Sequence, residues 1–492
     1  MPLDYDLLIL GGTPIAREAA IAARSLQARV ALVEPLPQLG NWAGTEALCH
    51  QAFVQLERNR EHLLESTREP DTELARVPSW AAIWDWVTTS VAALEEGRSP
   101  AVLMARGVDV VIGKAEFHRR PHLGVTVNRR SLRSRAYLVA RGFNWLIPTI
   151  SGLAELQPLT PHSLWHTNWA VLPQRLIILG YSPTALELAQ TFCRLGTQVT
   201  LVTRDRLLPW AEPEAAQLLM AQLEVDGVEL FTRTQVTKAG QSPTGKWIQT
   251  EFQTIEADEI LVAGAQVSDL DGLNLAGVGV QLNRSATVSP QREANNSPGG
   301  DIVVRSNLRS TNPRIYGCQF PELPFARQAA RVAIRNALFF PWAHLHPEQI
   351  PRVVMTDVAL ASVGLSEAQA RHRYGDDAVV QSESFKSLAI AQMQSNTTGF
   401  CKLIARRNGE LLGIHLVGSH VEDVGAIAIL ALQTKQTVRA LAELPLSSPS
   451  TAEILRQTAL AWQRQRLHQH PQRDWLEDWH EGRRSGAGWR KI

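Results

Sequence analysis

The chain of 492 residues is longer than one hydrophobic core normally serves, so two or three domains are expected. Hydrophobic residues make up 45% and charged residues 20%, which is ordinary for a soluble globular protein. The formal net charge of +1 argues against nucleic acid as a partner. The N-terminal run YDLLIL reads as a buried strand, and the absence of an apolar run of about 18 residues predicts no transmembrane segment.

The four cysteines are scattered, with neither a C-x-x-C pair nor the spacing of a metal site. Isolated cysteines of this kind mostly behave as small apolar residues and suit a reducing compartment. A cytoplasmic protein without a metal site is therefore expected. The cysteines are Cys49, Cys193, Cys318 and Cys401.

Residues 5–34 read as strand, glycine turn, helix and strand, the order that opens a dinucleotide-binding unit. Gly11 takes the first place of the G-x-G-x-x-G motif, and Thr13 and Ala16 take the second and third. A threonine at the second place puts a side chain where a phosphate should approach the backbone. Glu34 ends the second strand, where a ribose acceptor is expected. The candidate cofactor contacts of this unit are Gly11, Gly12, Pro14 and Glu34.

Residues 79–94, SWAAIWDWVTTSVAAL, have the spacing of an amphipathic helix with Trp80 and Trp84 on one face. Two interpretations are open: a face that docks a partner, or a helix packed on its neighbour. The second is favoured, because amphipathic helices usually bury such a stripe.

The strand–turn–helix–strand order returns at 175–203, with Gly180, Ser182 and Ala185 in the three glycine places. Only the first glycine survives here too. A purely structural role for both units is an open alternative, because the motif indicates binding only in its full context.

The acidic residue expected after the second strand of this unit is Thr203, and Arg204 and Arg206 follow it. Loss of the acid removes a ribose acceptor, whereas arginines can hold a 2′-phosphate. NADPH is favoured over NADH if either binds, and the candidate contacts are Gly180, Ser182, Arg204 and Arg206.

Two such units, together with five further segments in the same order, make the chain resemble the pyridine nucleotide-disulfide oxidoreductases, such as dihydrolipoamide dehydrogenase, glutathione reductase and mercuric reductase. The match runs from about Tyr5 to Ala461. It implies an α/β fold with two Rossmann-type domains, FAD-like and NAD(P)-like, and a C-terminal α+β dimerisation domain. The further segments are 206–230, 257–280, 310–320, 352–370 and 399–418.

The resemblance also implies domain boundaries and a homodimer. The FAD-type domain spans 1–150 and continues at 271–345, and the NAD(P)-type domain spans 151–270. The dimerisation domain spans 346–461, and residues 462–492 form a tryptophan-rich basic tail.

In the family, electrons pass from NAD(P)H through FAD to a disulfide, and a C-terminal His-Glu pair of the other subunit handles protons. The family segment with both cysteines aligns with Gly40 to Ala52, which makes Gly40 a candidate flavin contact. Ala43 and Leu48 then occupy the cysteine positions. Cys49 is one residue past the second position, and a single thiol cannot form the disulfide. Thiol–disulfide catalysis is excluded.

Two other catalytic pairs are also broken. The family's flavin-side lysine falls at Ala52, and its carboxylate partner is matched by Glu187, for which a partly solvated helix position is favoured. The C-terminal histidine position is Ser448, which cannot exchange a proton near neutral pH. Glu453, at the acidic position, is expected to cap or pair structurally. No catalytic residue is predicted.

The flavin contacts are altered as well. The family's Gly-Asp pair that holds the ribityl chain is replaced by Gln319-Phe320. The family has an A-T-G-like segment at each of two places where the chain crosses between domains. In this sequence both segments keep small residues but lack the threonine hydroxyl, and Gly142 in the first one is a candidate contact. FAD and NAD(P)H therefore stay open as cofactors.

Three functions follow from these observations. The leading interpretation is a redox-altered or redox-inactive family member without thiol–disulfide activity, a candidate pseudoenzyme. An FAD-dependent NAD(P)H oxidoreductase with a non-disulfide acceptor is the first alternative. A non-catalytic dimeric scaffold or nucleotide sensor is the second. The tail at 462–492 is a candidate docking segment for a protein partner, and its alternative is a helix, begun near Asp474, that folds back on the dimerisation domain.

Overall fold

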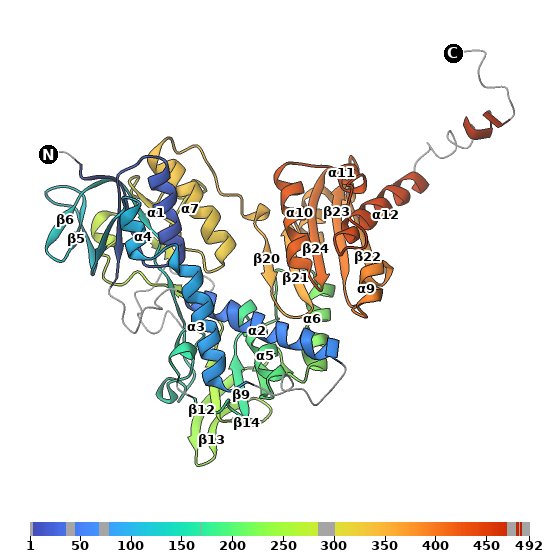
Figure 1. The fold of residues 1–492 in the computed structure, drawn as a ribbon, viewed down its shortest axis with the longest axis horizontal. Helices are drawn as coiled ribbons and strands as arrows, with labels where there is room; N and C mark the ends of the chain where they lie inside the picture. Colours follow the sequence, from blue (N-terminus) through green and yellow to red (C-terminus); the bar gives the residue numbers. More distant parts are fainter. Residues whose placement is uncertain are drawn as a thin grey trace. The chain divides into compact units, whose positions relative to one another are not determined.

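The structure is a computed structural model that describes seven stretches of the chain. These are residues 3–35, 45–67, 78–167, 169–283, 301–469, 479–481 and 483–484. The chain divides into two compact units, each described by itself below (Figure 1). The first comprises Met1–Leu208 and Gln222–Pro347, and the second comprises Pro209–Ala221 and Glu348–Ile492.

A five-stranded parallel sheet, ordered β19-β7-β1-β2-β3, opens the first unit. Its strands read as apolar runs because a parallel sheet is covered on both faces. Helices α1 and α7 pack against each other beside it (Figure 1). The strands are β1 (Tyr5–Leu10), β2 (Val30–Glu34), β3 (Asp109–Ile112), β7 (Ser134–Val139) and β19 (Ile315–Gly317), and the helices are α1 (Pro14–Ser25), α4 (Pro100–Ala105) and α7 (Leu323–Leu338).

Short strands complete this part of the unit. Strands β4, β5 and β6 form an antiparallel meander, whereas β8 pairs with β16 and β17 pairs with β18. Their bounds are β4 (Ala115–His118), β5 (Gly124–Val127), β6 (Arg130–Leu132), β8 (Phe143–Trp145), β16 (Gln266–Ser268), β17 (Leu282–Asn283) and β18 (Asp301–Ile302).

A second parallel sheet, ordered β11-β10-β9-β15, repeats the strand–turn–helix–strand order, and an antiparallel sheet of β12, β13 and β14 packs beside it. Its strands are β9 (Arg175–Leu179), β10 (Gln198–Val202), β11 (Glu229–Phe231) and β15 (Glu259–Val262). The antiparallel strands are β12 (Val236–Ser242), β13 (Gly245–Thr250) and β14 (Thr254–Ala257), and the helix is α5 (Pro183–Arg194). Helix α6 (Pro213–Val225) is grouped with the second unit as far as Ala221.

Helices α2 (Glu46–Thr67) and α3 (Trp80–Glu96) pack together in the first unit. The helix predicted from the tryptophan spacing is confirmed, but its buried stripe differs from the predicted pairing. Trp80 is buried and stacks on Trp165 with ring centroids 5.8 Å apart, whereas Trp84 stays 37% exposed. The stripe instead follows the helical period through Trp80, Ile83, Val87 and Val91.

The second unit is built on an antiparallel sheet ordered β20-β21-β24-β23-β22. Helices α10 and α12 pack on it and bury an aliphatic core (Figure 1). Its elements are β20 (Arg352–Val354), β21 (Ala359–Gly364), β22 (Ala378–Ser384), β23 (Phe400–Arg406), β24 (Leu411–Gly418), α8 (Glu367–Tyr374), α9 (Ala389–Met393), α10 (Val421–Gln433), α11 (Val438–Ala442) and α12 (Glu453–Gln469).

The predicted fold class, two Rossmann-type units and a C-terminal α+β domain, is confirmed. The boundaries between the two Rossmann-type domains stay predictions. The predicted tail helix near Asp474 falls outside the described residues, whereas α12 continues to Gln469. None of the described helices combines the length and apolar character that a membrane span requires.

Candidate functional site

The first glycine turn joins β1 to α1 and is held against the strand that crosses beside it. Gly11 has φ +149°, and a Cβ atom there would lie 2.2 Å from the carbonyl oxygen of Ala140. Only glycine fits so close an approach. The first glycine place is therefore required by the packing of the backbone, whether or not a nucleotide binds.

The hydroxyl of Thr13, at the second glycine place, makes hydrogen bonds within the protein. As the N-cap of α1 it accepts a hydrogen bond from the amide of Ala16 at 3.2 Å. It also donates to the carbonyl of Ala140 at 3.1 Å, and its methyl group faces Gly142. The side chain thus ties the start of the helix to the crossing strand and uses an amide that a phosphate would otherwise meet.

The second glycine turn, between β9 and α5, has the same arrangement. A Cβ at Gly180 would lie 2.3 Å from the carbonyl oxygen of Ala263. The Ser182 hydroxyl accepts from the amide of Ala185 at 3.1 Å and donates to the carbonyl of Ala263 at 2.6 Å. Both turns therefore carry the same internal hydroxyl bridge.

Glu34, the predicted ribose acceptor, is buried and bound by an arginine. Arg17 Nε and Nη2 donate to the two Glu34 oxygens at 2.8 and 3.2 Å, and Arg17 also reaches Glu95 at 3.3 Å. Burial alone would lower the pKa of Arg17, but its hydrogen bond to Glu34 and the two carboxylates outweigh burial, and the pKa is raised. The Glu34 carboxylate therefore already forms an ion pair within the protein.

The end of β19 carries a buried amide. Neither polar atom of the Gln319 side chain is exposed, and neither has a hydrogen-bond partner among the residues that the structure describes. The ring of Phe320 packs against Phe325, with centroids 5.9 Å apart. An unpaired buried amide costs about 1–3 kcal/mol.

The remaining candidate contacts of the second nucleotide-binding motif, which belongs to the first compact unit, lie at the surface. Arg204 and Arg206 are both exposed, and neither makes an ion pair within the described stretches. They follow Thr203, which is buried. Whether they meet a 2′-phosphate stays a prediction.

None of the four cysteines forms a disulfide with another, and the thiols of Cys318 and Cys401 are wholly buried. Burial raises the pKa of each to about 12. The Cys318 thiol donates to the carbonyl of Ala326 at 3.1 Å. Cys49 is buried on α2, and Cys193 donates to the carbonyl of Asp226 at 3.1 Å.

Thiol reagents should therefore find little to attack in the folded protein. A pKa of about 12 leaves roughly a thousandfold less thiolate at neutral pH than an ordinary cysteine has. Titration with Ellman's reagent is expected to release thiol slowly before, and fully after, denaturation in urea. Rapid reaction of two thiols in the native protein, followed by a new intramolecular disulfide, would contradict this expectation.

Glu187 was predicted to be partly solvated, and that prediction is wrong. Its carboxylate is buried on α5 and lies 2.5 Å from Nε2 of His50, which is buried on α2. Nothing in the sequence indicated that these residues would pair, because a histidine two residues before the expected lysine position belongs to no motif. Nδ1 of His50 is buried without a hydrogen-bond partner among the described residues.

The contact between α2 and α5 continues along both helices. Phe53 meets Phe192 with ring centroids 5.3 Å apart, and two turns beyond the first pair Glu57 lies 3.8 Å from Arg194. The acid is on α5 in the first pair and on α2 in the second. Alternation of this kind fixes the register of two helices.

The second unit holds a buried charge cluster around Lys402 on β23. Its Nζ lies 2.6 Å from both Glu212 and Glu367 and 3.3 Å from Glu214. Burial alone would lower the pKa of Lys402, but its hydrogen bonds to Glu212 and Glu367 raise it above the usual value. The cluster anchors the segment that begins α6 to the sheet of this unit.

His415 on β24 extends this cluster. Its Nδ1 lies 2.6 Å from the Ser362 hydroxyl, and its Nε2 is 3.0 Å from the carbonyl oxygen of Leu365. Nε2 also lies 3.7 Å from Glu212. Burial lowers the pKa of His415, so the folded state holds it neutral.

At the C-terminal dyad position, Ser448 is exposed. Glu453 accepts a hydrogen bond from the amide of Ser450 at 3.2 Å and pairs with Arg456 at 3.2 Å. The acid thus has the structural role expected for it.

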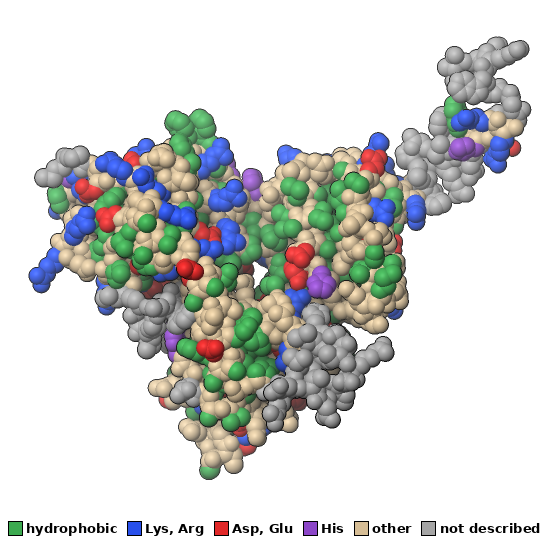
Figure 2. All heavy atoms as spheres, in the orientation of Figure 1, with side chains coloured by type: hydrophobic (Ala, Val, Ile, Leu, Met, Phe, Trp, Pro, Cys, Tyr) green, Lys and Arg blue, Asp and Glu red, His purple; other side chains and the backbone are tan. Residues whose placement is uncertain are grey.

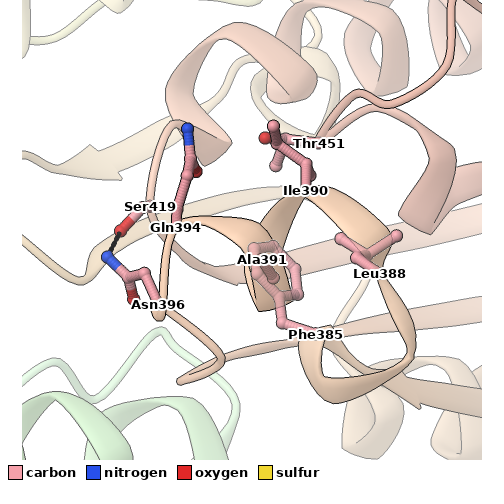
Figure 3. A pocket seen from close by; sticks show the side chains of 8 residues that line it. All are labelled: Phe385, Leu388, Ile390, Ala391, Gln394, Asn396, Ser419 and Thr451. Carbon is pink, nitrogen blue, oxygen red and sulfur yellow. Dashed lines mark hydrogen bonds between the residues drawn. The ribbon is translucent and has the colours of Figure 1, made fainter.

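A small recess in the second unit lies between α9 and the loops that carry Ser419 and Thr451 (Figure 3). Asn396 donates to the Ser419 hydroxyl at 2.5 Å across one side of it. Its volume of about 10 Å³ fits one water molecule, so it is no cofactor site. The lining residues are Phe385, Leu388, Ile390, Ala391, Gln394, Asn396, Ser419 and Thr451.

The chain matches the sequence patterns of one family along most of its length. The sequence pattern described as "Pyridine nucleotide-disulphide oxidoreductase" matches residues 5–318, and that of its dimerisation domain matches residues 350–459. The chain belongs to the pyridine nucleotide-disulphide oxidoreductase family. The members of this family depend on FAD and NAD(P)H.

Relatives of the family cover most of the chain. A mercuric reductase of Streptomyces lividans is 29% identical over 470 residues, which are 92% of this chain and 95% of the enzyme. One of Staphylococcus aureus is 28% identical over 477 residues, 93% of this chain and 82% of the enzyme.

Solved structures show the same fold. LpdA from Mycobacterium tuberculosis has a TM-score of 0.80 at 22% identity and covers 92% of this chain and 99% of its own. The HOCl-induced flavoprotein disulfide reductase RclA from Escherichia coli has a TM-score of 0.76 at 19% identity, with coverage of 92% and 99%.

The residues present do not fit FAD held in the family's way. The Thr13 side chain fills the second glycine place, Arg17 occupies the Glu34 carboxylate, and Phe320 replaces the ribityl aspartate. Gly12 and Pro14 stand at the turn, but Gly40 and Ala43 lie outside the described residues. Leu48, at the second cysteine position, is a partly buried residue of α2.

Proposed function

We propose that this chain is a homodimeric, redox-inactive member of the family that lacks thiol–disulfide activity and works as a protein scaffold. The observation that carries the proposal is the identical closure of both nucleotide turns. Thr13 and Ser182 each occupy the amide at the third helical position and reach back to the crossing strand. A pyrophosphate that binds either turn would have to displace the hydroxyl from the amide there.

The state of the other sites favours the same conclusion. Glu34 is held by Arg17, the cysteine positions are Ala43 and Leu48, and the histidine position is Ser448. In contrast, the dimerisation domain retains a packed sheet and core, which supports a homodimer. Four cysteines without a disulfide among them support a cytoplasmic location.

Purification without added cofactor, followed by soaking in FAD, is expected to give a colourless protein after gel filtration. The amide at the third helical position of each turn is already bonded to a hydroxyl, and the ribose carboxylate is already paired. A visible absorption spectrum checks this, and NADPH is then added without air. A retained flavin that NADPH bleaches would overturn the proposal.

A second candidate is an FAD-dependent NAD(P)H oxidoreductase that uses an acceptor other than a disulfide. The buried, unpaired amide of Gln319 favours it, because a bound ligand with hydroxyl or carbonyl groups would supply the hydrogen-bond partners that this amide has not found in the described residues. The same spectrum separates the two candidates. If the protein keeps flavin, a Gln319→Ala variant should retain much less of it.

A further inference from the structure

Three large aromatic side chains protrude in the first unit, directly after α7. Phe339 is 58% exposed, Phe340 64% and Trp342 76%. The rings of Phe340 and Trp342 stack with centroids 4.9 Å apart and an interplanar angle of 16°. Apolar side chains gathered this way mark an interaction site more often than scattered ones do. We call these three residues the aromatic tip.

Hydrogen bonds fix the chain that flanks the aromatic tip. The buried Asn336 side chain donates to the carbonyls of Asn307 and Ala343, at 2.9 and 2.7 Å, and accepts from the Ala343 amide at 3.0 Å. The Leu345 amide donates a hydrogen bond to the backbone carbonyl of Ser306 at 2.7 Å. The chain on both sides of the aromatic tip is thus fixed, and its rings are displayed on a formed loop.

The surface beside the aromatic tip is positive. Arg331 and Arg335 are exposed along α7, and Arg305 is exposed on the loop that Leu345 contacts. None of the three has an ion pair among the described residues. Glu322, at the opposite end of α7, is the only acid between residues 302 and 347, a stretch that contains six arginines.

Figure 2 shows the same distribution on the face that it displays. Lys and Arg side chains spread over the part formed by α1 and α7, and a hydrophobic group protrudes at its upper edge. The surface is convex at this place, and a protrusion cannot enclose a peptide as a groove does. Exposed aromatic rings flanked by arginines instead suit the boundary of an anionic lipid layer, where rings insert and cations meet headgroups.

We propose that the aromatic tip, with Arg305, Arg331 and Arg335, binds the protein reversibly to an anionic phospholipid surface. Phe340 and Trp342 enter the headgroup region, and the three guanidinium groups contact lipid phosphates. The charges and the rings act together, because neither a few cations nor a few rings alone give stable attachment. This proposal does not depend on whether the chain binds flavin.

Cosedimentation of the full chain with vesicles tests the proposal. Vesicles of equal parts phosphatidylglycerol and phosphatidylcholine should bind the protein, and vesicles of phosphatidylcholine alone should bind it at least tenfold more weakly. Raising the ionic strength should release it. The Arg331→Gln/Arg335→Gln variant should lose about thirtyfold in affinity for the anionic vesicles.

The aromatic contribution has a matched control. Phe340→Ser/Trp342→Ser should lose at least tenfold in affinity, whereas Phe252→Ser, which removes a 77% exposed phenyl ring from the β13–β14 turn, should bind as the parent does. Equal binding to both vesicle types, or no loss in either double variant, would overturn the proposal. A change from dimer to monomer in Phe340→Ser/Trp342→Ser would also overturn it and assign the aromatic tip to a second copy of the chain.

Discussion

A Lys402→Met variant should lower the free energy of unfolding of the second unit by about 3–5 kcal/mol. Methionine keeps the length of the side chain but removes the cation that lies 2.6 Å from both Glu212 and Glu367. The buried Glu212 carboxylate and the partly exposed Glu367 carboxylate then lose their shared cation. Hydrogen exchange of the β23 and β24 amides in increasing urea measures the loss within this unit.

The cluster also predicts the direction of pH dependence. The hydrogen bond from Lys402 to Glu367 holds the pKa of Glu367 below the usual range, and burial lowers the pKa of His415. Both groups bind a proton more readily in the unfolded chain, so stability falls as the pH drops below about 6.5 and further below about 4.3. The pKa of Lys402 is raised, so its contribution is present below about pH 10.4 and is lost as the pH rises beyond that.

Removing Lys402 should therefore flatten the alkaline side of the stability profile. Lys386→Met is the matched control, because Lys386 is exposed in the same unit and has no ion pair among the described residues. An equal effect of the two substitutions would show that the cluster contributes no more than a surface lysine does.

A His50→Leu variant should destabilise the first unit by about 3 kcal/mol, and the double variant His50→Leu/Glu187→Leu should recover most of that loss. The single change leaves the buried Glu187 carboxylate without the imidazole that lies 2.5 Å away. The double change replaces both polar groups with apolar ones. Protection of the α5 amides against hydrogen exchange provides the measurement.

His122→Leu serves as its control, since His122 is exposed in the same unit. A double variant that is less stable than the single one would show that Glu187 is stabilised by its other surroundings. The coupling between residues 50 and 187 would then be negligible.

Much of the fold could be predicted because its signals are local. The two glycine turns, the apolar runs of β1 and β9 and the helix after Ser79 are each set by short stretches of sequence. Gly11 and Gly180 were recognised from the same stretches, although the reason for them is the approach of Ala140 and Ala263, more than 80 residues away in the chain.

The interactions within the sites could not be predicted in this way. Nothing near Glu34 in the sequence indicates that Arg17 will occupy it, and nothing near Glu187 points to His50. Both pairs form because the fold brings together side chains from different segments, a helix and a strand in the first pair and two helices in the second. The hydroxyl bridges were predicted only in part: Thr13 was recognised as an obstacle to a phosphate and Ser182 was taken as a candidate contact, but the bonds of both to the crossing strands were not foreseen.

The short stretch Pro209–Ala221 is grouped with the second unit, far ahead of the rest of that unit in the chain. A fragment that begins at Glu348 would therefore lack Glu212, so Lys402 would keep only Glu367 as a close acidic partner and His415 would lose its acidic neighbour. Dissection of this protein by truncation should fail for the C-terminal part unless the helix that starts after Glu212 is supplied as a separate peptide. In biosynthesis, the same dependence means that this part can complete its folding only with a segment that left the ribosome more than a hundred residues earlier.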